Sequence, residues 1–330
     1  MSIENDGELQ IGQNLTIRGR KYLVLEQLSH ASRGRWRVRD PQPYPRGTLM
    51  TALVLEDSPD LHQLERSLRR LPRVANGIPH LISVGFHKGK RVLIISWQEG
   101  NSVEAYLKRV YAGTFDRPSV WESIRRMRSL AHSLKVLYCH CQLVHGDIKP
   151  GNLILPNIPG SISLIDYGSS WQAESTTSRL PGDGVLDFYA APELLNRERA
   201  VDFRADQFST GVILFELLTL TLPFGGIGGK AGREQDRTEM EGEYQPPSEL
   251  LSRTERIPKS IMAEIDSLVG RTLKLDPKQR FETPQAFCDA MDSVWFRLSG
   301  SQDRITERQR KHLPRNFSGA LELLKRFVGR

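Results

Sequence analysis

Carboxylate, amide and ammonium side chains gather within residues 144–168, in a pattern suited to phosphoryl chemistry. Asp147 and Asn152 precede one short apolar run, and Asp166 follows a second. Apolar runs of this length, bounded by Gly and Pro, predict two short buried strands joined by a turn at residues 156–160. Such a hairpin brings Asn152 and Asp166 together as two oxygen ligands for Mg²⁺, a cation that also binds substrate phosphates.

Asp147 and Lys149 have the chemistry of catalytic groups beside this metal site. Asp147 lies in the loop ahead of Asn152, where its carboxylate can accept a proton from a hydroxyl nucleophile. Lys149 can place a positive charge on a phosphoryl group during transfer. A lone Asp in a loop is usually a turn or capping residue, so the hypothesis depends on the whole set of residues.

This stretch resembles the catalytic and metal-binding loops of the protein kinase superfamily, His-Arg-Asp-x-Lys-x-x-Asn followed by Asp-Phe-Gly. The chain has His-Gly-Asp-Ile-Lys-Pro-Gly-Asn over residues 145–152 and Asp-Tyr-Gly over residues 166–168. The resemblance covers about residues 20–296. It implies an α+β, two-lobed protein-kinase-like fold, with ATP and Mg²⁺ as cofactors and a protein as substrate or partner.

The resemblance also implies domain boundaries. Residues 1–14 would be a polar leader, and residues 15–296 the kinase-like domain. Within it, residues 15–97 would form a small, mostly antiparallel β lobe, and residues 98–296 a larger, mostly helical lobe.

The family's glycine-rich loop over ATP, G-x-G-x-x-G, falls on residues 29–34, where only the last glycine is kept. Small residues still let backbone N–H groups approach phosphates. The strand predicted over residues 91–97 leads into the family's adenine-binding hinge, with Ile95 at the gate of the pocket. The resemblance thus assigns cofactor contacts to Ser29, Ala31, Gly34, Ile95, Trp97, Asn152 and Asp166.

The strand predicted over residues 49–55 lacks the lysine that holds the α- and β-phosphates in the family. Its usual partner would be Glu65, in a helix predicted over residues 61–71. Without the lysine, Glu65 is predicted to be a solvated helix residue. An arginine of the neighbouring strand could supply the missing charge, and the candidates are Arg33, Arg35 and Arg37.

Predicted helices carry the rest of the large lobe. An amphipathic helix over residues 119–141 would deliver the chain to His145, and further helices would lie near residues 261–273 and 284–296. The resemblance implies that Asp206, on an apolar helix over residues 206–220, binds the catalytic-loop backbone. It also implies an ion pair of Arg280 with Glu193 in Ala191-Pro192-Glu193.

Two further departures concern regulation and substrate. Gly146 replaces the arginine that pairs with a phosphate on the activation segment in many family members, so we expect activity that does not depend on phosphorylation of residues 169–184. Leu186 stands where the family usually has Thr. That change weakens the case for positioning a peptide substrate.

Composition excludes several protein classes. The chain has 330 residues and a formal net charge of +7, of which residues 297–330, with nine basic and three acidic residues, carry +6. The remaining +1 argues against nucleic-acid binding by the main body. A polar N-terminus, no apolar run long enough to span a bilayer, and three cysteines predicted to be buried free thiols indicate a cytoplasmic protein. The sequence does not predict the oligomeric state.

Residues 297–330 are predicted to form a basic linker and then an amphipathic C-terminal helix. The linker would cover residues 298–316. The helix has an apolar face beside basic side chains, so it could dock on the domain, on a membrane surface or on a partner.

Three functions compete. The favoured one is a Ser/Thr protein kinase-like phosphotransferase, because the base and the metal ligands are retained. The second is a pseudokinase scaffold, which the absent lysine, the thinned glycine loop and Leu186 support. The third is a small-molecule phosphotransferase of the aminoglycoside or choline kinase type. Those relatives also use His-Gly-Asp, but Lys149, Ala191-Pro192-Glu193 and Asp206 argue against it.

Overall fold

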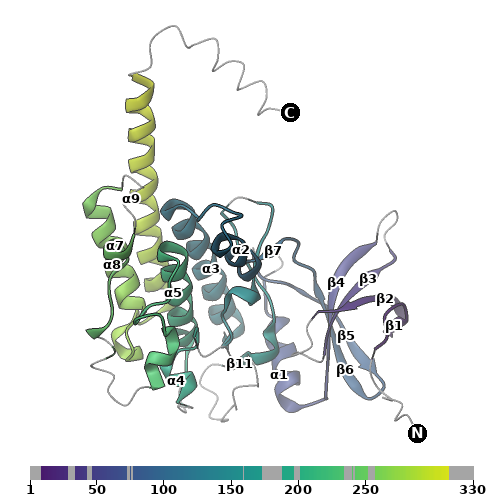
Figure 1. The fold of residues 1–330 in the computed structure, drawn as a ribbon. Coiled ribbons are helices and arrows are strands. Elements are labelled where there is room, and N and C mark those ends of the chain that lie inside the picture. The colour runs from purple at the N-terminus through teal and green to yellow at the C-terminus, as the bar shows by residue number, and fades with distance from the viewer. Residues whose placement is uncertain are drawn as a thin grey trace, which may run out of the picture.

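The chain forms two lobes, a small one built on an antiparallel sheet and a larger helical one (Figure 1). The structure is a computed structural model that describes residues 9–28, 34–42, 47–72, 75, 77–158, 160–172, 188–196, 201–233, 240, 242–251 and 257–311, with side chains as far as residue 301. The predicted α+β, two-lobed kinase-like fold is confirmed.

The sheet of the small lobe has the strand order β1-β2-β3-β4-β6-β5, and every pairing is antiparallel. Side chains alternate between its two faces, as strand geometry requires. One face buries a core that includes Trp36, Val38 and Ile94, and the other carries Arg35 and Leu53. The strands are β1 Asn14–Ile17, β2 Arg20–Gln27, β3 Arg35–Asp40, β4 Thr48–Leu55, β5 Leu81–His87 and β6 Lys90–Ser96.

Helix α1 (Pro59–Leu68) lies at the junction of the two lobes, beside β11 (Trp171–Gln172) (Figure 1). Ser58 caps its N-terminus by accepting a hydrogen bond from Leu61 N at 3.2 Å. Leu61, Leu64 and Leu68 are buried on one side, in the larger hydrophobic core. The helix is therefore attached to the sheet and also reaches the catalytic region.

The large lobe packs around α5 (Phe203–Thr219), whose side chains are buried nearly all round, as expected of a helix at the centre of a domain. The predicted amphipathic helix is confirmed as α3 (Val120–Cys141) with Ser119 as its N-cap. The remaining helices are α2 Val103–Tyr111, α4 Pro192–Leu195, α7 Pro247–Leu250, α8 Lys259–Thr272 and α9 Pro284–Lys311. Short 3₁₀ turns are η1 Pro150–Asn152, η2 Tyr167–Ser169, η3 Gly228–Arg233 and η4 Pro277–Gln279, and short strands are β7 Asn101–Ser102, β8 Leu143–Val144, β9 Leu153–Leu155 and β10 Ser163–Leu164.

Two local predictions are wrong. Helix α9 does not end near residue 296 but continues to Lys311, away from the lobe (Figure 1), so residues 298–311 are helix and not linker. Residues 301–311 contain helix-forming Gln, Arg and Glu and no proline, so nothing there breaks the helix. Of the three cysteines, Cys139 is exposed, because it lies on the outer side of α3.

Residues 1–8 and 312–330 lie outside the described residues, and with them most of the predicted leader and the C-terminal amphipathic face. No helix in the described part of the chain has the length and apolar content that a membrane span requires.

The predicted ion pair between Arg280 and Glu193 is present and buried. Arg280 Nη1 lies 2.7 Å from Glu193 Oε1, and Nη2 lies 3.0 Å from Oε2. The same guanidinium donates to the carbonyls of Arg204, Lys274 and Leu275. This pair joins α4 to the residue that ends η4, with every contact made by one planar fork.

We predict that Arg280→Ala destabilises the protein by about 3–5 kcal/mol, because it leaves the Glu193 carboxylate buried and unpaired. Arg280→Lys should recover only part of this, since an ammonium cannot make the bidentate contact. Urea unfolding measures both changes. Lys108→Ala, which breaks an exposed pair with Glu104, is the control and should cost under about 1 kcal/mol. Equal costs for Arg280→Ala and Lys108→Ala would contradict the prediction.

Candidate active site

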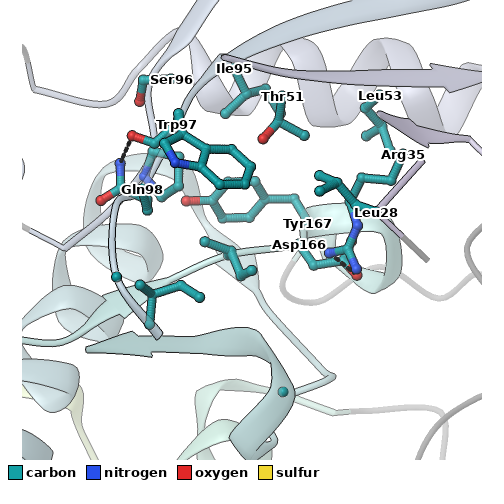
Figure 2. A pocket seen from close by; sticks show the side chains of 15 residues that line it. Leu28, Arg35, Thr51, Leu53, Ile95, Ser96, Trp97, Gln98, Asp166 and Tyr167 are labelled. Atoms are coloured by element: carbon teal, nitrogen blue, oxygen red, sulfur yellow. Dashed lines mark hydrogen bonds and ion pairs between the residues drawn. The ribbon is translucent and has the colours of Figure 1, made fainter. Parts of the chain in front are cut away.

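A cavity of about 230 Å³ lies between the two lobes (Figure 2). Ile95, Trp97 and Asp166, predicted from the sequence, line it. It also contains residues that the sequence analysis did not single out as cofactor contacts, among them Leu28, Thr51 and Leu53. For Thr51 and Leu53 the signal was the strand alternation, which puts every second side chain of β4 on the cavity side, whereas Leu28 follows β2 and had no such signal. The other lining residues are Arg35, Pro79, Ser96, Gln98, Gly100, Gly151, Ile154, Ile165 and Tyr167.

Asp206, in the first turn of α5, holds the backbone below this cavity. Its carboxylate accepts from His145 N at 2.7 Å and from Gly146 N at 2.8 Å. Burial raises the pKa of Asp206, and the His145 ring and the two backbone N–H groups offset part of that rise. The predicted role of Asp206 as anchor of the catalytic loop is thus present in the contacts.

Asp147, Lys149 and Asn152 form one hydrogen-bonded group in this loop. Asn152 Nδ2 donates to the Asp147 carbonyl and to Asp147 Oδ2, both at 2.9 Å. Lys149 Nζ lies 2.7 Å from the same Oδ2. The Asp147 carboxylate is therefore fixed in place, with a cation beside it, as a base next to a transferring phosphoryl group requires.

The predicted hairpin is present: β9 and β10 pair antiparallel, and Ile165 N donates to Asn152 O at 2.9 Å. This bond sets Asn152 and Asp166 on adjacent strand ends. Because both Asn152 bonds to Asp147 come from Nδ2, Oδ1 is left as the oxygen for a cation. The donor set, one amide and one carboxylate oxygen, fits Mg²⁺ with substrate oxygens completing its shell. Among the described residues no three His, Cys, Asp or Glu side chains gather as a larger metal site.

Arg35, on β3, places a cation in the cavity beside Asp166. It lies directly opposite Leu53 in the β3–β4 register, and its Nη1 is 2.7 Å from Asp166 Oδ2 (Figure 2). Both side chains are 14% exposed. Arg35 Nε and Nη1 are both buried and have no hydrogen-bond partner among the described residues. The contact with Asp166 is therefore an ion pair and not an aligned hydrogen bond, and donors remain for a ligand in the cavity.

Comparisons with known proteins agree with this geometry. A family model of the protein kinase domain matches residues 65–296. The chain belongs to the protein kinase family.

Two of its relatives are CBL-interacting protein kinase 22 of Oryza sativa subsp. japonica and the serine/threonine-protein kinase PknJ of Mycobacterium tuberculosis. The first is 30% identical over 72% of this chain and 50% of its own length, and the second 29% identical over 78% and 42%. This chain thus spans about half the length of these relatives. A solved structure of the M. tuberculosis PknI kinase domain has a TM-score of 0.56 at 21% identity, covering 87% of this chain and 99% of that one.

Helix α1 of this kinase-like domain is held by charged side chains that do not line the cavity. Leu53 and Leu64 belong to the same apolar core, while Glu65 pairs with Arg91 Nη2 on β6 at 2.7 Å and with Arg69 Nη2 at 2.8 Å. Burial would raise the pKa of Glu65, but the hydrogen bond from Arg69 and the charges of both arginines bring it below its ordinary value. The prediction of a solvated Glu65 is therefore wrong, because Arg91 offsets the cost of its burial.

The predicted glycine loop is described only at its end, since Ser29, Ala31 and Arg33 lie outside the described residues. Gly34 accepts a hydrogen bond from Val54 N at 2.6 Å. A Cβ at Gly34 would overlap the Val54 carbonyl oxygen. Gly34 is thus required for the close approach of β3 and β4, and it does not line the cavity described above.

Gly146, in the family's arginine position, is covered by Trp171. Its φ is +73°, and a Cβ there would overlap the Trp171 ring. Trp171 belongs to β11, which pairs with β8 just before His145. The space beside the catalytic loop is therefore filled by an indole. The predicted activation segment lies largely in residues 173–187, outside the described residues.

We predict that Gly146→Ala destabilises the protein by more than the ~1–2 kcal/mol of a left-handed alanine, because the Trp171 ring must also move. Gly113→Ala is the matched control: its φ is +68° and nothing lies within 4 Å of a Cβ there. Denaturant unfolding of both variants separates backbone strain from packing. In a Trp171→Ala background, Gly146→Ala should destabilise the protein as much as Gly113→Ala does. Equal costs of Gly146→Ala and Gly113→Ala in the parent protein would show that the indole does not fill the position.

Proposed function

We propose that this protein is a Ser/Thr protein kinase-like phosphotransferase that moves the γ-phosphoryl group of ATP to a protein hydroxyl. The ion pair of Arg35 with Asp166 carries the proposal, because it restores a cation opposite the position that Leu53 occupies. Lys149, which the family's Ser/Thr kinases share, and the name of the relative PknJ support the Ser/Thr assignment. The buried pair of Glu193 and Arg280 supports a protein kinase over a small-molecule phosphotransferase.

The proposed reaction uses the contacts of the catalytic loop. Asp147 accepts the proton of the acceptor hydroxyl as its oxygen bonds to the γ-phosphorus. The bond from that phosphorus to the β–γ bridging oxygen breaks, and ADP leaves with the electron pair. Lys149 and Arg35 place positive charge on the phosphate oxygens. Asn152 and Asp166 would hold Mg²⁺, which supplies further positive charge when bound.

A second candidate is a nucleotide-binding pseudokinase. One observation favours it: Arg35 lies on Asp166 Oδ2, so a metal ion must share or displace that contact. If the pair persists with nucleotide bound, phosphate is held by the guanidinium and transfer is slow. The two candidates differ in how nucleotide affinity depends on Mg²⁺.

We predict that Arg35→Ala weakens nucleotide binding about ten- to hundredfold. The reason is the loss of charge-assisted hydrogen bonds worth about 1.5–3 kcal/mol. Arg35→Lys should retain part of the affinity. Titration with ATP analogues measures the change. Arg39→Ala, on the same strand but exposed and away from the cavity, is the control. Unchanged affinity in Arg35→Ala would leave the lysine position without a substitute and favour the pseudokinase.

We predict that Asp147→Asn and Asp166→Asn fail in different ways. Asp147→Asn should abolish transfer while Mg²⁺·ATP binds with nearly parental affinity, because the base is lost and the metal pair is intact. Asp166→Asn should weaken Mg²⁺-dependent binding, because a carboxylate leaves a site with few protein ligands.

Titrations with Mg²⁺ and with EDTA, alongside a phosphotransfer assay, give both readouts. Without metal, Asp166→Asn should bind nucleotide at least as well as the parent, because Arg35 loses its carboxylate partner. Transfer by Asp147→Asn at the parental rate would exclude Asp147 as the base. A parent protein with equal affinity in Mg²⁺ and EDTA would favour the pseudokinase.

A further inference from the structure

Gln172 on β11 joins the small lobe to the catalytic region through one amide group. Its Oε1 accepts from Gln63 Nε2 at 2.8 Å and from Ser67 Oγ at 3.0 Å, both on α1. Its Nε2 donates to Gln142 Oε1 at 3.2 Å. Gln142 caps the C-terminus of α3 just before β8, the strand that leads to His145. One side chain thus contacts α1 and the chain segment that enters the catalytic loop.

The backbone fixes where this amide lies. Gln172 pairs with Leu143, and Trp171 pairs with Val144. Successive side chains of a strand point to opposite sides: Trp171 covers Gly146, and Gln172 reaches α1. Ser67 is fully buried, so a hydroxyl deprived of its Gln172 acceptor would be costly to leave unpaired. The contact is therefore part of the folded state.

The three side chains that bond to Gln172, those of Gln63, Ser67 and Gln142, are neutral, although Gln63 Oε1 also accepts from Arg66 Nη2 at 2.6 Å. In the family pattern, an arginine at position 146 would bind a phosphate on the activation segment, but Gly146 cannot do so, and the indole of Trp171 fills that space. Another face of α1 is tied to the sheet by Glu65 and Arg91. The hydrogen bonds of Gln172 therefore attach α1 to the large lobe without a phosphate.

We propose that Gln172 is a positioning residue that holds α1 against the catalytic region in the arrangement needed for phosphotransfer, independently of phosphorylation. Asp166 lies one 3₁₀ turn before β11. A displacement of β11 therefore moves Asp166 relative to Arg35. The effect on catalysis rests on the proposed phosphotransferase function, whereas the attachment of α1 does not.

Hydrogen exchange of the full chain, treated with phosphatase, tests the attachment. Gln172→Ala should speed exchange of the backbone amides of residues 61–69 on the order of five- to tenfold, as expected for losing one or two hydrogen bonds. Amides of α8 should be unchanged. Gln172→Glu keeps the acceptor for Gln63 and Ser67 and should restore most of the protection. Gln285→Ala, which removes an exposed amide from α9, is the matched control.

Two results would overturn the proposed attachment of α1 by Gln172. One is parental exchange of α1 in Gln172→Ala. The other is a gain in exchange of α1 when the parent protein is merely dephosphorylated. Neither measurement requires detectable phosphotransfer, so the hydrogen-exchange test remains valid even if the proposed function is wrong.

Steady-state kinetics test the positioning role. In Gln172→Ala, kcat should fall several-fold, in line with the loosened helix, while KM for ATP changes less than about twofold, because the cavity contacts remain. Gln172→Glu should recover kcat, because it keeps the acceptor for Gln63 and Ser67. An unchanged kcat together with a loosened α1 would show that the helix position does not limit transfer, and would overturn the positioning role.

Discussion

The buried carboxylate of Asp206 is the constraint on which the catalytic region depends. It sits in the first turn of α5, where the helix dipole favours a negative charge, and it accepts the N–H groups of both His145 and Gly146. Those bonds fix the backbone from which Asp147 extends. They also leave Gly146 in the left-handed region, which lets Trp171 approach. One carboxylate thus determines both the place of the base and the packing of β11 against the loop.

The cation in the cavity comes from β3, whereas the family pattern places it on the strand equivalent to β4. A side chain on β3 and one on β4 that face each other across an antiparallel pair lie within reach of the same point. Arg35 lies opposite Leu53, so its guanidinium is within reach of the point that a lysine on the cavity side of β4 would occupy. The longer guanidinium spans the extra distance and reaches Asp166. Under the proposed function, the phosphates need a cation at this point in space, and either strand can provide it.

Local patterns in the sequence predicted the elements well, and long-range side-chain contacts poorly. The hairpin of β9 and β10, helices α3 and α5, and the pair of Arg280 with Glu193 follow from apolar periodicity or from family motifs. Glu65 was assigned to solvent because its partner Arg91 lies 26 residues away on β6. Gln172 carried no signal, since its contacts with Gln63 and Ser67 are 109 and 105 residues distant. Such pairs have no fixed spacing in the sequence and appear only when the elements that carry them are packed together.

Two different arginines, Arg35 and Arg91, contact Asp166 in the cavity and Glu65 on α1. This changes how α1 and the cavity influence each other. In the family pattern, one lysine contacts both the phosphates and the glutamate of the helix, so a ligand that orders the lysine also favours one helix position. Here Arg35 faces the cavity and Arg91 holds Glu65. A ligand shifts a conformational equilibrium only through contacts that differ between the two states. Phosphates bound by Arg35 make no such contact with Glu65, so the link between the cavity and α1 runs through Asp166 and β11, where Gln172 lies, and not through a shared lysine.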